Sequence, residues 1–281
     1  MEKSLKKKTK STHNMKKKIL KIRKSVFKKF NLKVVPIEKI DLNTQFPESN
    51  FAERKILEIC NKFSMTGYER LFSLIQSIHY IYNNRVSGDF VECGVWKGGN
   101  LILFGDLCQK YSLDKTIFGY DTFEGMTEPT SHDVNFYEKS AKKNLEKYKS
   151  QKNHENSFWV ANDIDDTKKN ITNNTDHKKI RLIKGDVLKT LDKKENLPSS
   201  ISLLRLDTDF YESTKKELEV LYPLLNKGGI LIIDDYGHWK GCRKAVDEYF
   251  ENKNINFFMF YYVILGRSKR ALATPWEAKL S

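Results

Sequence analysis

Short apolar runs alternate along this chain with longer stretches in which apolar residues recur every three or four positions. The short runs have the length and composition of buried β-strands, and they cover residues 88–94, 116–121, 179–184, 201–206 and 229–233. The longer stretches predict helices, and those after the first strand cover residues 100–111, 139–150, 212–225 and 241–250. Alternating strands and helices of this kind predict an α/β fold, a doubly wound and mostly parallel sheet with helices on both faces.

Further elements flank this alternation. Residues 51–84 contain two helical patterns, and the second starts near Gly67. Its apolar stripe is that of a core-facing helix and consists of Leu71, Leu74, Ile75, Ile78 and Ile81. Residues 255–260 and 262–266 predict a closing antiparallel pair, which brings the expected sheet to seven strands.

The predicted elements divide the chain into three parts. We expect a basic tail at residues 1–35, an N-terminal helical extension at 36–86 and an α/β domain at 87–281. The extension begins with linker or irregular structure up to Asn50. Within the domain, residues 128–176 form a polar insertion rich in Lys and Asn, which is a candidate lid.

The charge of the chain is concentrated in the tail. The formal net charge is +14, and the first 35 residues contain 13 Lys, one Arg and one acid, a net +13. About +1 remains for everything after Val35. Nucleic-acid binding by the folded part is therefore not expected, because phosphate contacts require a basic surface.

Residues 16–30 predict a short basic amphipathic helix. Their apolar residues recur at helical spacing, with lysines elsewhere: Ile19, Ile22, Val26 and Phe30. Such a helix lies on an anionic membrane surface, remains a solvated extension, or docks on a partner, and the pattern leaves all three open. No run of 18 apolar residues predicts a spanning helix, and the tail lacks the apolar core of a secretory signal.

The four cysteines contain no CxxC spacing, so reduced thiols are the simplest interpretation. We therefore expect a cytoplasmic protein, and one peripheral to the inner face of the membrane if the amphipathic helix binds lipid.

An acid follows each predicted parallel strand, at the edge where doubly wound sheets bind ligands. The first strand leads into Glu92-Cys-Gly-Val-Trp-Lys-Gly-Gly99. Glu92 stands before Gly94, where a carboxylate would repel a pyrophosphate but suits an amine-bearing ligand, and the amino group of S-adenosylmethionine qualifies. A glycine turn without a ligand is the alternative.

The next two strand ends suggest a nucleoside. Asp121 can accept hydrogen bonds from both ribose hydroxyls, and Asp186 can accept one from the adenine amino group. Helix capping is the alternative for an acid at such a position. Together with the glycine loop, the two acids describe a nucleoside lying across three consecutive strand ends.

The last two parallel strands end in Asp207-x-Asp209 and Asp234-Asp235. If these strands are neighbours, three or four carboxylates converge and repel one another. A hard divalent cation resolves the repulsion, and oxygen-only ligands favour magnesium. The alternative is that Asp234 or Asp235 caps the following turn and that Asp207 pairs with a lysine.

Other residues near the strand ends are weaker candidates. His238 follows the paired acids, while His132 and His154 lie in the insertion, and lone loop histidines are usually only solvated. Trp96 and Trp239 also sit beside strand ends, where they either wall a pocket or cover the sheet.

With these motifs in view, the chain resembles the macrocin O-methyltransferase family, whose members methylate sugar hydroxyls of antibiotics. The resemblance spans most of the chain after the tail. It is carried by residues 65–71, 88–99, 121–125, 204–214, 221–223, 227–229, 234–237 and 242–246.

The resemblance implies a Rossmann-like class I methyltransferase domain, with S-adenosylmethionine and magnesium as cofactors. By this resemblance Asp207, Asp234 and Asp235 hold the ion, and Asp209 is the general base that takes the proton of a sugar hydroxyl. The positions that match cofactor contacts are Thr66, Glu92, Gly94, Asp121, Phe123 and Asp186.

Two departures limit what the resemblance carries over. The glycine that the family usually has between the paired acids is Thr208 here, and the insertion is hard to align. The acceptor stays open among a sugar hydroxyl of a glycoside, nucleotide sugar or glycan, and a small phenolic or other hydroxyl metabolite. A nucleoside-binding scaffold without turnover is the third alternative, and formation of a homo-oligomer is also left open.

Overall fold

The computed structural model describes residues 41–149, 161–251, 253, 257–259 and 273–275. The chain separates into two compact units, one ending at Asn50 and the other beginning at Phe51. The described part of the first unit contains α2 (Leu42–Gln45), so the linker predicted up to Asn50 is wrong at this point. Asp41 caps α2 by accepting a hydrogen bond from the Asn43 amide, a local preference of Asp at helix N-termini. The basic tail and the predicted amphipathic helix lie outside the described residues.

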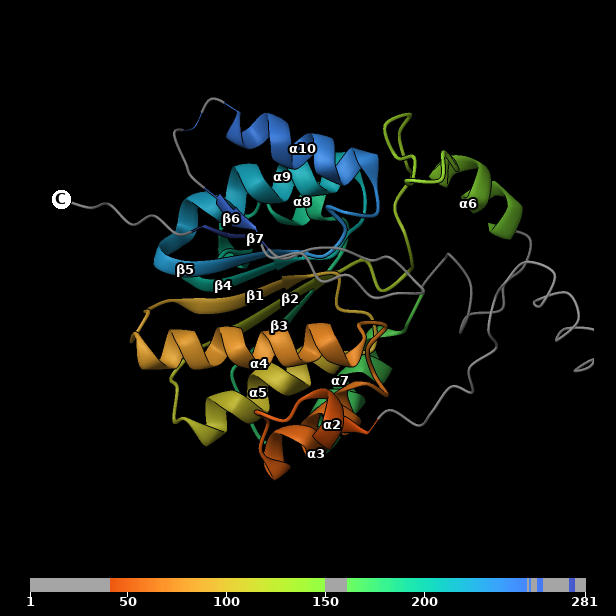
Figure 1. Cartoon of the computed structure of the whole chain (residues 1–281). Helices are drawn as coiled ribbons and strands as arrows, with labels where there is room; N and C mark the ends of the chain where they lie inside the picture. Colours follow the sequence, from red (N-terminus) through yellow and green to blue (C-terminus); the bar gives the residue numbers. More distant parts are fainter. Residues whose placement is uncertain (1–40, 150–160, 252, 254–256, 260–272, 276–281) are drawn as a thin grey trace, which may run out of the picture. The chain divides into compact units, whose positions relative to one another are not determined.

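The second unit is built on a sheet of five parallel strands in the order β3-β2-β1-β4-β5 (Figure 1). The strands are β1 (Asp89–Cys93), β2 (Ile117–Asp121), β3 (Ile180–Lys184), β4 (Ile201–Leu206) and β5 (Leu225–Ile233). All five predicted parallel strands are therefore present. β5 begins earlier than predicted, because Leu225 already pairs with Ile201 before the register shifts.

Helices cover both faces of the sheet, which confirms the doubly wound arrangement (Figure 1). One face carries α4 (Tyr68–Asn83), α5 (Gly99–Lys110) and α7 (Ile164–Asn174), and α3 (Phe51–Cys60) packs on α4 and α5. The other face carries α8 (Val187–Thr190), α9 (Tyr211–Leu221) and α10 (Lys240–Phe250). The two short 3-10 turns are η1 (Lys194–Asn196) and η2 (Tyr222–Leu224).

Two elements differ from their predictions. The helix predicted to reach Leu225 stops at Leu221 and continues as η2, because Pro223 lacks the amide that an α-helix needs. The closing antiparallel pair consists of β6 (Phe257–Met259) and β7 (Ala273–Pro275), a two-stranded sheet of its own. The expected partner at 262–266 lies outside the described residues, and the expected seven-stranded sheet is not confirmed.

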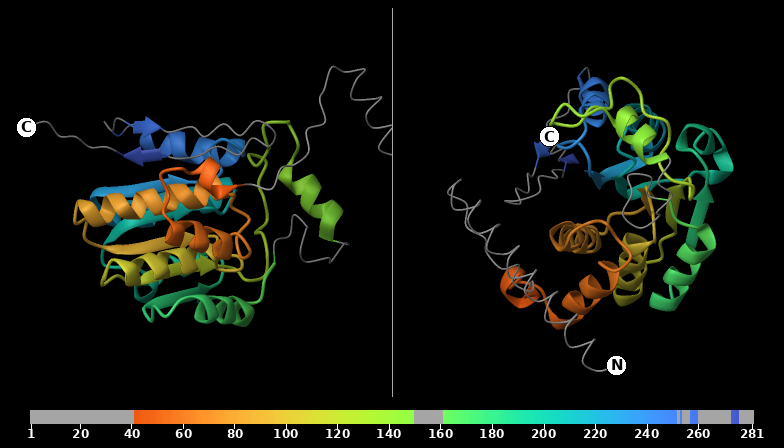
Figure 2. Two further views of the ribbon diagram at one scale, coloured as in Figure 1. Left: turned by 60° about the horizontal axis from the view of Figure 1, so that its bottom comes forward. Right: turned by 90° about the vertical axis from the view of Figure 1, so that its right-hand side faces the viewer.

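The predicted insertion contains α6 (Ala141–Lys149), which lies beyond the carboxyl ends of the strands (Figure 2). Its first residue, Ala141, is fully buried in the core cluster on the α8–α10 side of the sheet. The segment before α6 is held in place by Asp133, whose side chain is fully buried. Its carboxylate accepts hydrogen bonds from the Tyr211 amide at 2.8 Å and the Thr130 amide at 2.6 Å. The first part of the insertion is thus anchored to the start of α9.

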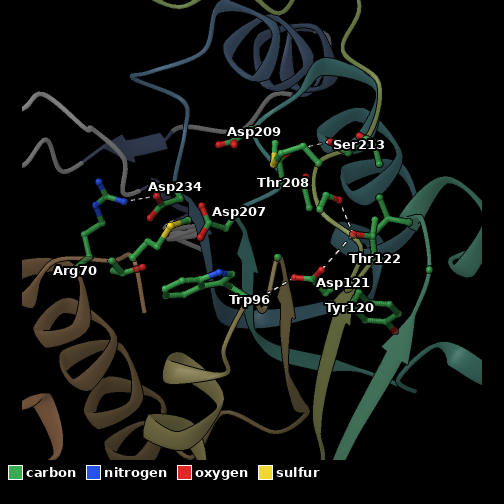
Figure 3. Close-up of a pocket in the computed structure, with 18 residues that line it drawn as sticks. Arg70, Trp96, Tyr120, Asp121, Thr122, Asp207, Thr208, Asp209, Ser213 and Asp234 are labelled. Atoms are coloured by element: carbon green, nitrogen blue, oxygen red, sulfur yellow. Dashed lines mark hydrogen bonds and ion pairs between the residues drawn. The ribbon is translucent and has the colours of Figure 1, made fainter. Parts of the chain in front are cut away.

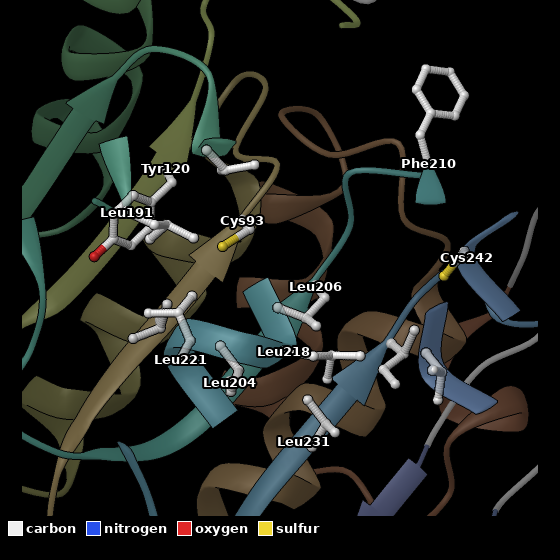
Figure 4. Packing of buried hydrophobic residues seen from close by; sticks show 14 of the residues in the cluster. Cys93, Tyr120, Leu191, Leu204, Leu206, Phe210, Leu218, Leu221, Leu231 and Cys242 are labelled. Carbon is white, nitrogen blue, oxygen red and sulfur yellow. The ribbon is translucent and has the colours of Figure 1, made fainter. Parts of the chain in front are cut away.

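The core between the sheet and the α8–α10 layer is apolar and closely packed (Figure 4). Leu204 and Leu206 of β4 meet Leu218 and Leu221 of α9, and none of the four is more than 2% exposed. All members of the predicted stripe on α4 are buried against the other face. Burial of these side chains stabilises the fold by about 25 cal/mol per Å² of apolar surface. The packed core therefore holds in place the strand ends that carry the acids.

The four cysteines are buried and unpaired. Among the described residues, no helix has both the length and the apolar composition that crossing a bilayer requires.

Candidate active site

A pocket opens at the carboxyl ends of the parallel strands, where the sequence places its acids (Figure 3). The predicted site residues that line it are Thr66, Gly94, Asp121, Asp207, Asp209 and Asp234. Glu92, Phe123, Asp186 and Asp235 are not among its lining residues. Figure 3 shows Asp234 between Arg70 and Asp207, with Asp121 across the pocket beside Trp96.

Gly94 lets the loop after β1 pass directly against the end of β4. Its φ of +89° is rarely adopted by residues with a side chain. A Cβ atom at this position would lie 2.1 Å from the Asp207 carbonyl oxygen, too close for two non-bonded heavy atoms. The glycine therefore permits the close approach that brings the first strand end to the acids of the fourth.

Asp121 organises the floor of the pocket. Its Oδ2 accepts hydrogen bonds at 2.8 Å from the amides of Val95 and Trp96, and its Oδ1 accepts one at 2.7 Å from the Phe123 amide. The carboxylate thus holds the loop after β1 and the turn after β2. Because Asp121 also lines the pocket, it combines the turn-capping role with a position suited to a ribose.

Asp186 and Phe123 are sequence neighbours of residues that line the pocket. Asp186 caps α8 and accepts a hydrogen bond at 2.9 Å from the Leu188 amide, the capping alternative raised from the sequence. Its neighbours Gly185 and Val187 line the pocket. Phe123 is buried and has a left-handed backbone with a φ of +53°.

Glu92 is completely buried and faces Arg205, its direct partner in the register of β1 and β4. Arg205 Nη1 lies 2.7 Å from Glu92 Oε1, and Asn100 Nδ2 donates to the same oxygen at 2.6 Å. Burial raises the pKa of Glu92 to about 7, although Arg205 and Asn100 both favour the charged form. Within the described structure Glu92 therefore belongs to a buried ion-pair cluster beneath the pocket.

Arg205 is the centre of that cluster. Besides Glu92, it lies 2.8 Å from Asp207 Oδ2 and 2.8 Å from Asp234 Oδ1, and it donates to Thr66 Oγ1 at 3.1 Å. Burial alone lowers the pKa of a guanidinium, but the three carboxylates raise the pKa of Arg205 above its ordinary value. The side chain is 1% exposed, so its charge is neutralised only by these partners.

Arg70 of α4 binds Asp234, which also pairs with Arg205. Its Nη1 donates to Asp234 Oδ2 (Figure 3). Among the described residues, Asp207 pairs with Arg205 of the strand that it follows. Asp235 accepts hydrogen bonds from the amides of His238 and Trp239 through its backbone carbonyl, not its side chain.

Asp207, Asp234 and Asp235 fit a divalent cation. One carboxylate oxygen from each lies within 4.8 Å of the other two, the one such group of metal-capable side chains in the described residues. Ligands of an octahedral magnesium ion lie about 2.9 Å apart when adjacent and about 4.2 Å apart when opposite, so the three carboxylates would move inward to hold the ion. With Glu92, the cluster has four carboxylates against two guanidinium groups, and a cation of charge two would balance them if all are ionised.

Of the tryptophan and histidine candidates that the structure describes, one lines the pocket and the others pack elsewhere. Trp96 lines the pocket, whereas Trp239 is buried in the core and stacks edge-on against Phe210. His238 packs against Trp239 and His132 against Tyr211, and neither histidine lines the pocket. His154 lies outside the described residues.

The sequence reasoning missed Arg205, Arg70 and Glu217. Arg205 is the one charged residue in the mostly apolar run 201–206, and a buried charge is almost always paired, so its position is a usable signal. Arg70 stands in a polar first turn of α4 and Glu217 among other charges on α9, so neither stands out.

The chain is also similar in sequence to known proteins. A family model described as Macrocin-O-methyltransferase (TylF) matches residues 9–261. The chain is 31% identical over 195 residues to demethyldecarbamoylnovobiocin O-methyltransferase of Streptomyces niveus, which covers 67% of this chain and 68% of the relative. It is 30% identical over 194 residues to 8-demethyl-8-(2,3-dimethoxy-alpha-L-rhamnosyl)-tetracenomycin-C 4'-O-methyltransferase of Streptomyces olivaceus, with 66% and 67% covered.

The fold is also shared with solved structures. The O-methyltransferase NovP superposes with a TM-score of 0.62 at 27% identity, covering 76% of this chain and 83% of that protein. The calicheamicin methyltransferase CalS11 has a TM-score of 0.53 at 18% identity, covering 87% and 100%, and this likeness concerns the fold alone.

Proposed function

Because this chain belongs to the macrocin O-methyltransferase family, we propose that it transfers the methyl group of S-adenosylmethionine to a sugar hydroxyl with the help of magnesium. It is an O-methyltransferase by family, and its methyl donor is S-adenosylmethionine. The observation that carries the finer proposal is the convergence of Asp207, Asp209, Asp234 and Asp235 at two neighbouring strand ends.

The acceptor in this proposal is a sugar of a glycoside, nucleotide sugar or glycan. A similar enzyme is named for a rhamnosyl group, which supports a sugar over a phenol. The pocket adds polar walls suited to hydroxyl groups, among them Thr127, Thr208 and Ser213.

The donor is proposed to lie across β1, β2 and β3. Gly94 allows close approach of the backbone, Asp121 faces the ribose, and Thr66 stands beside Arg205 near the methionine end. Glu92 acts there through Arg205, since its own carboxylate is buried. Asp186 and Phe123 are proposed to shape the adenine side next to Gly185 and Thr122, which line the pocket.

Asp207, Asp234 and Asp235 are the residues proposed to hold magnesium. When bound, the ion supplies a positive charge that lowers the pKa of an acceptor hydroxyl, and the sulfonium donor supplies an electrophilic methyl group. Arg205 and Arg70 keep the carboxylates of Asp207 and Asp234 oriented. The arginines also limit the repulsion among the acids before any ion binds.

Asp209 is proposed as the base. It lines the pocket two residues after Asp207, so it can receive the proton of a hydroxyl presented at the acids. As that proton moves to the Asp209 carboxylate, the oxygen–methyl bond forms and the sulfur–methyl bond breaks, which leaves S-adenosylhomocysteine and a methyl ether. Catalysis in this scheme depends mainly on positioning and charge neutralisation.

The test is a methyl-transfer screen with labelled S-adenosylmethionine against glycosides, nucleotide sugars, glycans and catechol-like phenols. We expect product with sugars, loss of product with Asp209→Asn, and full product with the exposed control Asp192→Asn. Product with phenols alone would contradict the sugar acceptor. Binding of S-adenosylhomocysteine without product from any acceptor would instead favour a scaffold.

A further inference from the structure

Thr208 separates the two acids at the end of β4, and its side chain is tied to helix α9. Its Oγ1 donates a hydrogen bond to Glu217 Oε1 at 2.9 Å. Glu217 lies in the middle of α9 and is fully buried. The bond therefore connects the wall of the pocket, which Thr208 lines, to an element of the core.

Asp209 follows in an unusual backbone conformation. Its φ is +70°, in the left-handed region that residues with side chains seldom adopt. Such a conformation persists where the surrounding structure holds it. Here the Phe210 amide donates to the Thr208 carbonyl at 2.8 Å, and Ser213 Oγ approaches the same carbonyl at 3.4 Å.

The turn from Asp207 to Phe210 is held at both ends. The Asp207 amide donates to the Cys93 carbonyl at 2.9 Å, which secures the start of the turn on β1. α9 itself is anchored by Leu218 and Leu221, both fully buried. A glycine at position 208 would keep the backbone contacts but could not form the side-chain bond to Glu217.

We propose that Thr208 and Glu217 are a positioning pair, which holds the Asp207–Phe210 turn so that the Asp209 carboxylate faces the acceptor hydroxyl. This inference rests on the proposed function of Asp209 as the base. Both residues act through Asp209, and the bond that matters is the one from Thr208 Oγ1 to Glu217 Oε1.

The kinetic test compares variants that remove the bond with variants that keep it. Thr208→Val has the shape of threonine without the donor, and Glu217→Met lacks the acceptor. Each is expected to lower kcat about tenfold to a hundredfold, the scale of a small misplacement of a catalytic group. Thr208→Ser and Glu217→Gln retain a donor and an acceptor, and each is expected to keep kcat within about threefold of the wild type.

Three further readouts separate positioning from general damage. The Kd of S-adenosylhomocysteine is expected to stay unchanged in all four variants. The double variant Thr208→Val/Glu217→Met is expected to be no slower than either single variant, because one bond is lost in each case. Adding Thr208→Val to Asp209→Asn is expected to cause no further loss. Full kcat in Thr208→Val, multiplied losses in the double variant, or a parallel loss of S-adenosylhomocysteine binding would each overturn the proposal.

Hydrogen exchange tests the pair without any acceptor. Amides of residues 208–212 are expected to exchange faster in Thr208→Val and Glu217→Met than in the wild type, and unchanged in Thr208→Ser and Glu217→Gln. Unchanged exchange in the first two variants would overturn the pair even in an active enzyme. If the wild type methylates no acceptor, the proposed function fails, while the exchange rates still decide whether the pair holds the turn.

Discussion

Arg205 and Asp207, which flank Leu206 at the end of β4, form an ion pair with 2.8 Å between Nη1 and Oδ2. The same guanidinium reaches Glu92 on β1 and Asp234 after β5. One buried cation thereby links the ends of three adjacent strands and contacts two of the three proposed metal ligands, Asp207 and Asp234.

Arg205→Met is expected to destabilise the fold. Removing one partner of a buried ion-pair cluster leaves uncompensated carboxylates, which costs about 3–5 kcal/mol. The free energy of unfolding from urea titration measures the loss. Arg243→Met, which removes a more exposed arginine from α10 and its 3.4 Å contact with Asp247, is the matched control and is expected to cost under about 1 kcal/mol. Equal losses in the two variants would contradict the central role of Arg205.

Asn substitutions at the three proposed ligands are expected to weaken divalent-cation binding. Asp207→Asn, Asp234→Asn and Asp235→Asn each replace a charged oxygen ligand with a neutral one of the same size. Titration calorimetry with Mg²⁺ and Mn²⁺ measures the affinity, and Asp209→Asn is expected to bind the ions as the wild type does.

Removal of divalent ions is expected to abolish methyl transfer and to leave S-adenosylhomocysteine binding intact. The measurement is activity after exhaustive treatment with EDTA, followed by restoration with Mg²⁺. Activity that survives the chelator in full would rule out the metal part of the mechanism.

Gly94→Ala is expected to abolish binding of S-adenosylhomocysteine, because the new Cβ would collide with the Asp207 carbonyl. Gly228→Ala is the matched control, since Gly228 also has a positive φ, of +79°, but its Cβ would meet nothing closer than 3.6 Å. The control is expected to lose about 1–2 kcal/mol of stability from backbone strain and to retain binding. Calorimetry with the ligand and thermal unfolding distinguish the two effects.

Glu217→Gln is expected to become increasingly stable relative to the wild type as the pH rises. Burial raises the pKa of Glu217 to about 8 in the folded state, from an ordinary value of 4.5. The protonated carboxyl contributes stability that is fully present below about pH 4.5 and is lost as the pH rises through about 8. The glutamine has no proton to lose.

The measurement is the unfolding free energy of both proteins between pH 5 and pH 8.5, in EDTA. Glu219→Gln, at an exposed position of the same helix, is the control and is expected to leave the profile unchanged. A constant difference between Glu217→Gln and the wild type across this range would contradict the buried, protonated state.

Deletion of residues 1–33 is expected to remove binding to vesicles that contain anionic lipid. These residues lie outside the described part of the chain, and the prediction rests on the basic amphipathic pattern at 16–30. Sedimentation with vesicles of phosphatidylserine and phosphatidylcholine measures it, with pure phosphatidylcholine as the control. A full-length protein that fails to bind at low salt would refute the membrane interpretation.

The elements and the acids of the site could be predicted from the sequence because both depend on short-range patterns along the chain. Strand β4 was predicted at its observed bounds, since a short apolar run between polar segments has few other solutions. Asp207, Asp209 and Asp234 line one pocket, as expected where parallel strands bring their carboxyl ends to the same edge.

Which groups neutralise those acids was decided only by the tertiary structure. Glu92 and Arg205 are 113 positions apart, and they meet because β1 pairs with β4 in a register that places them side by side. The link from Thr208 to Glu217 likewise depends on how α9 packs on the sheet. Residue type and spacing predict that a buried charge needs a partner, but the partner's identity follows from long-range strand order and packing, which local patterns do not specify.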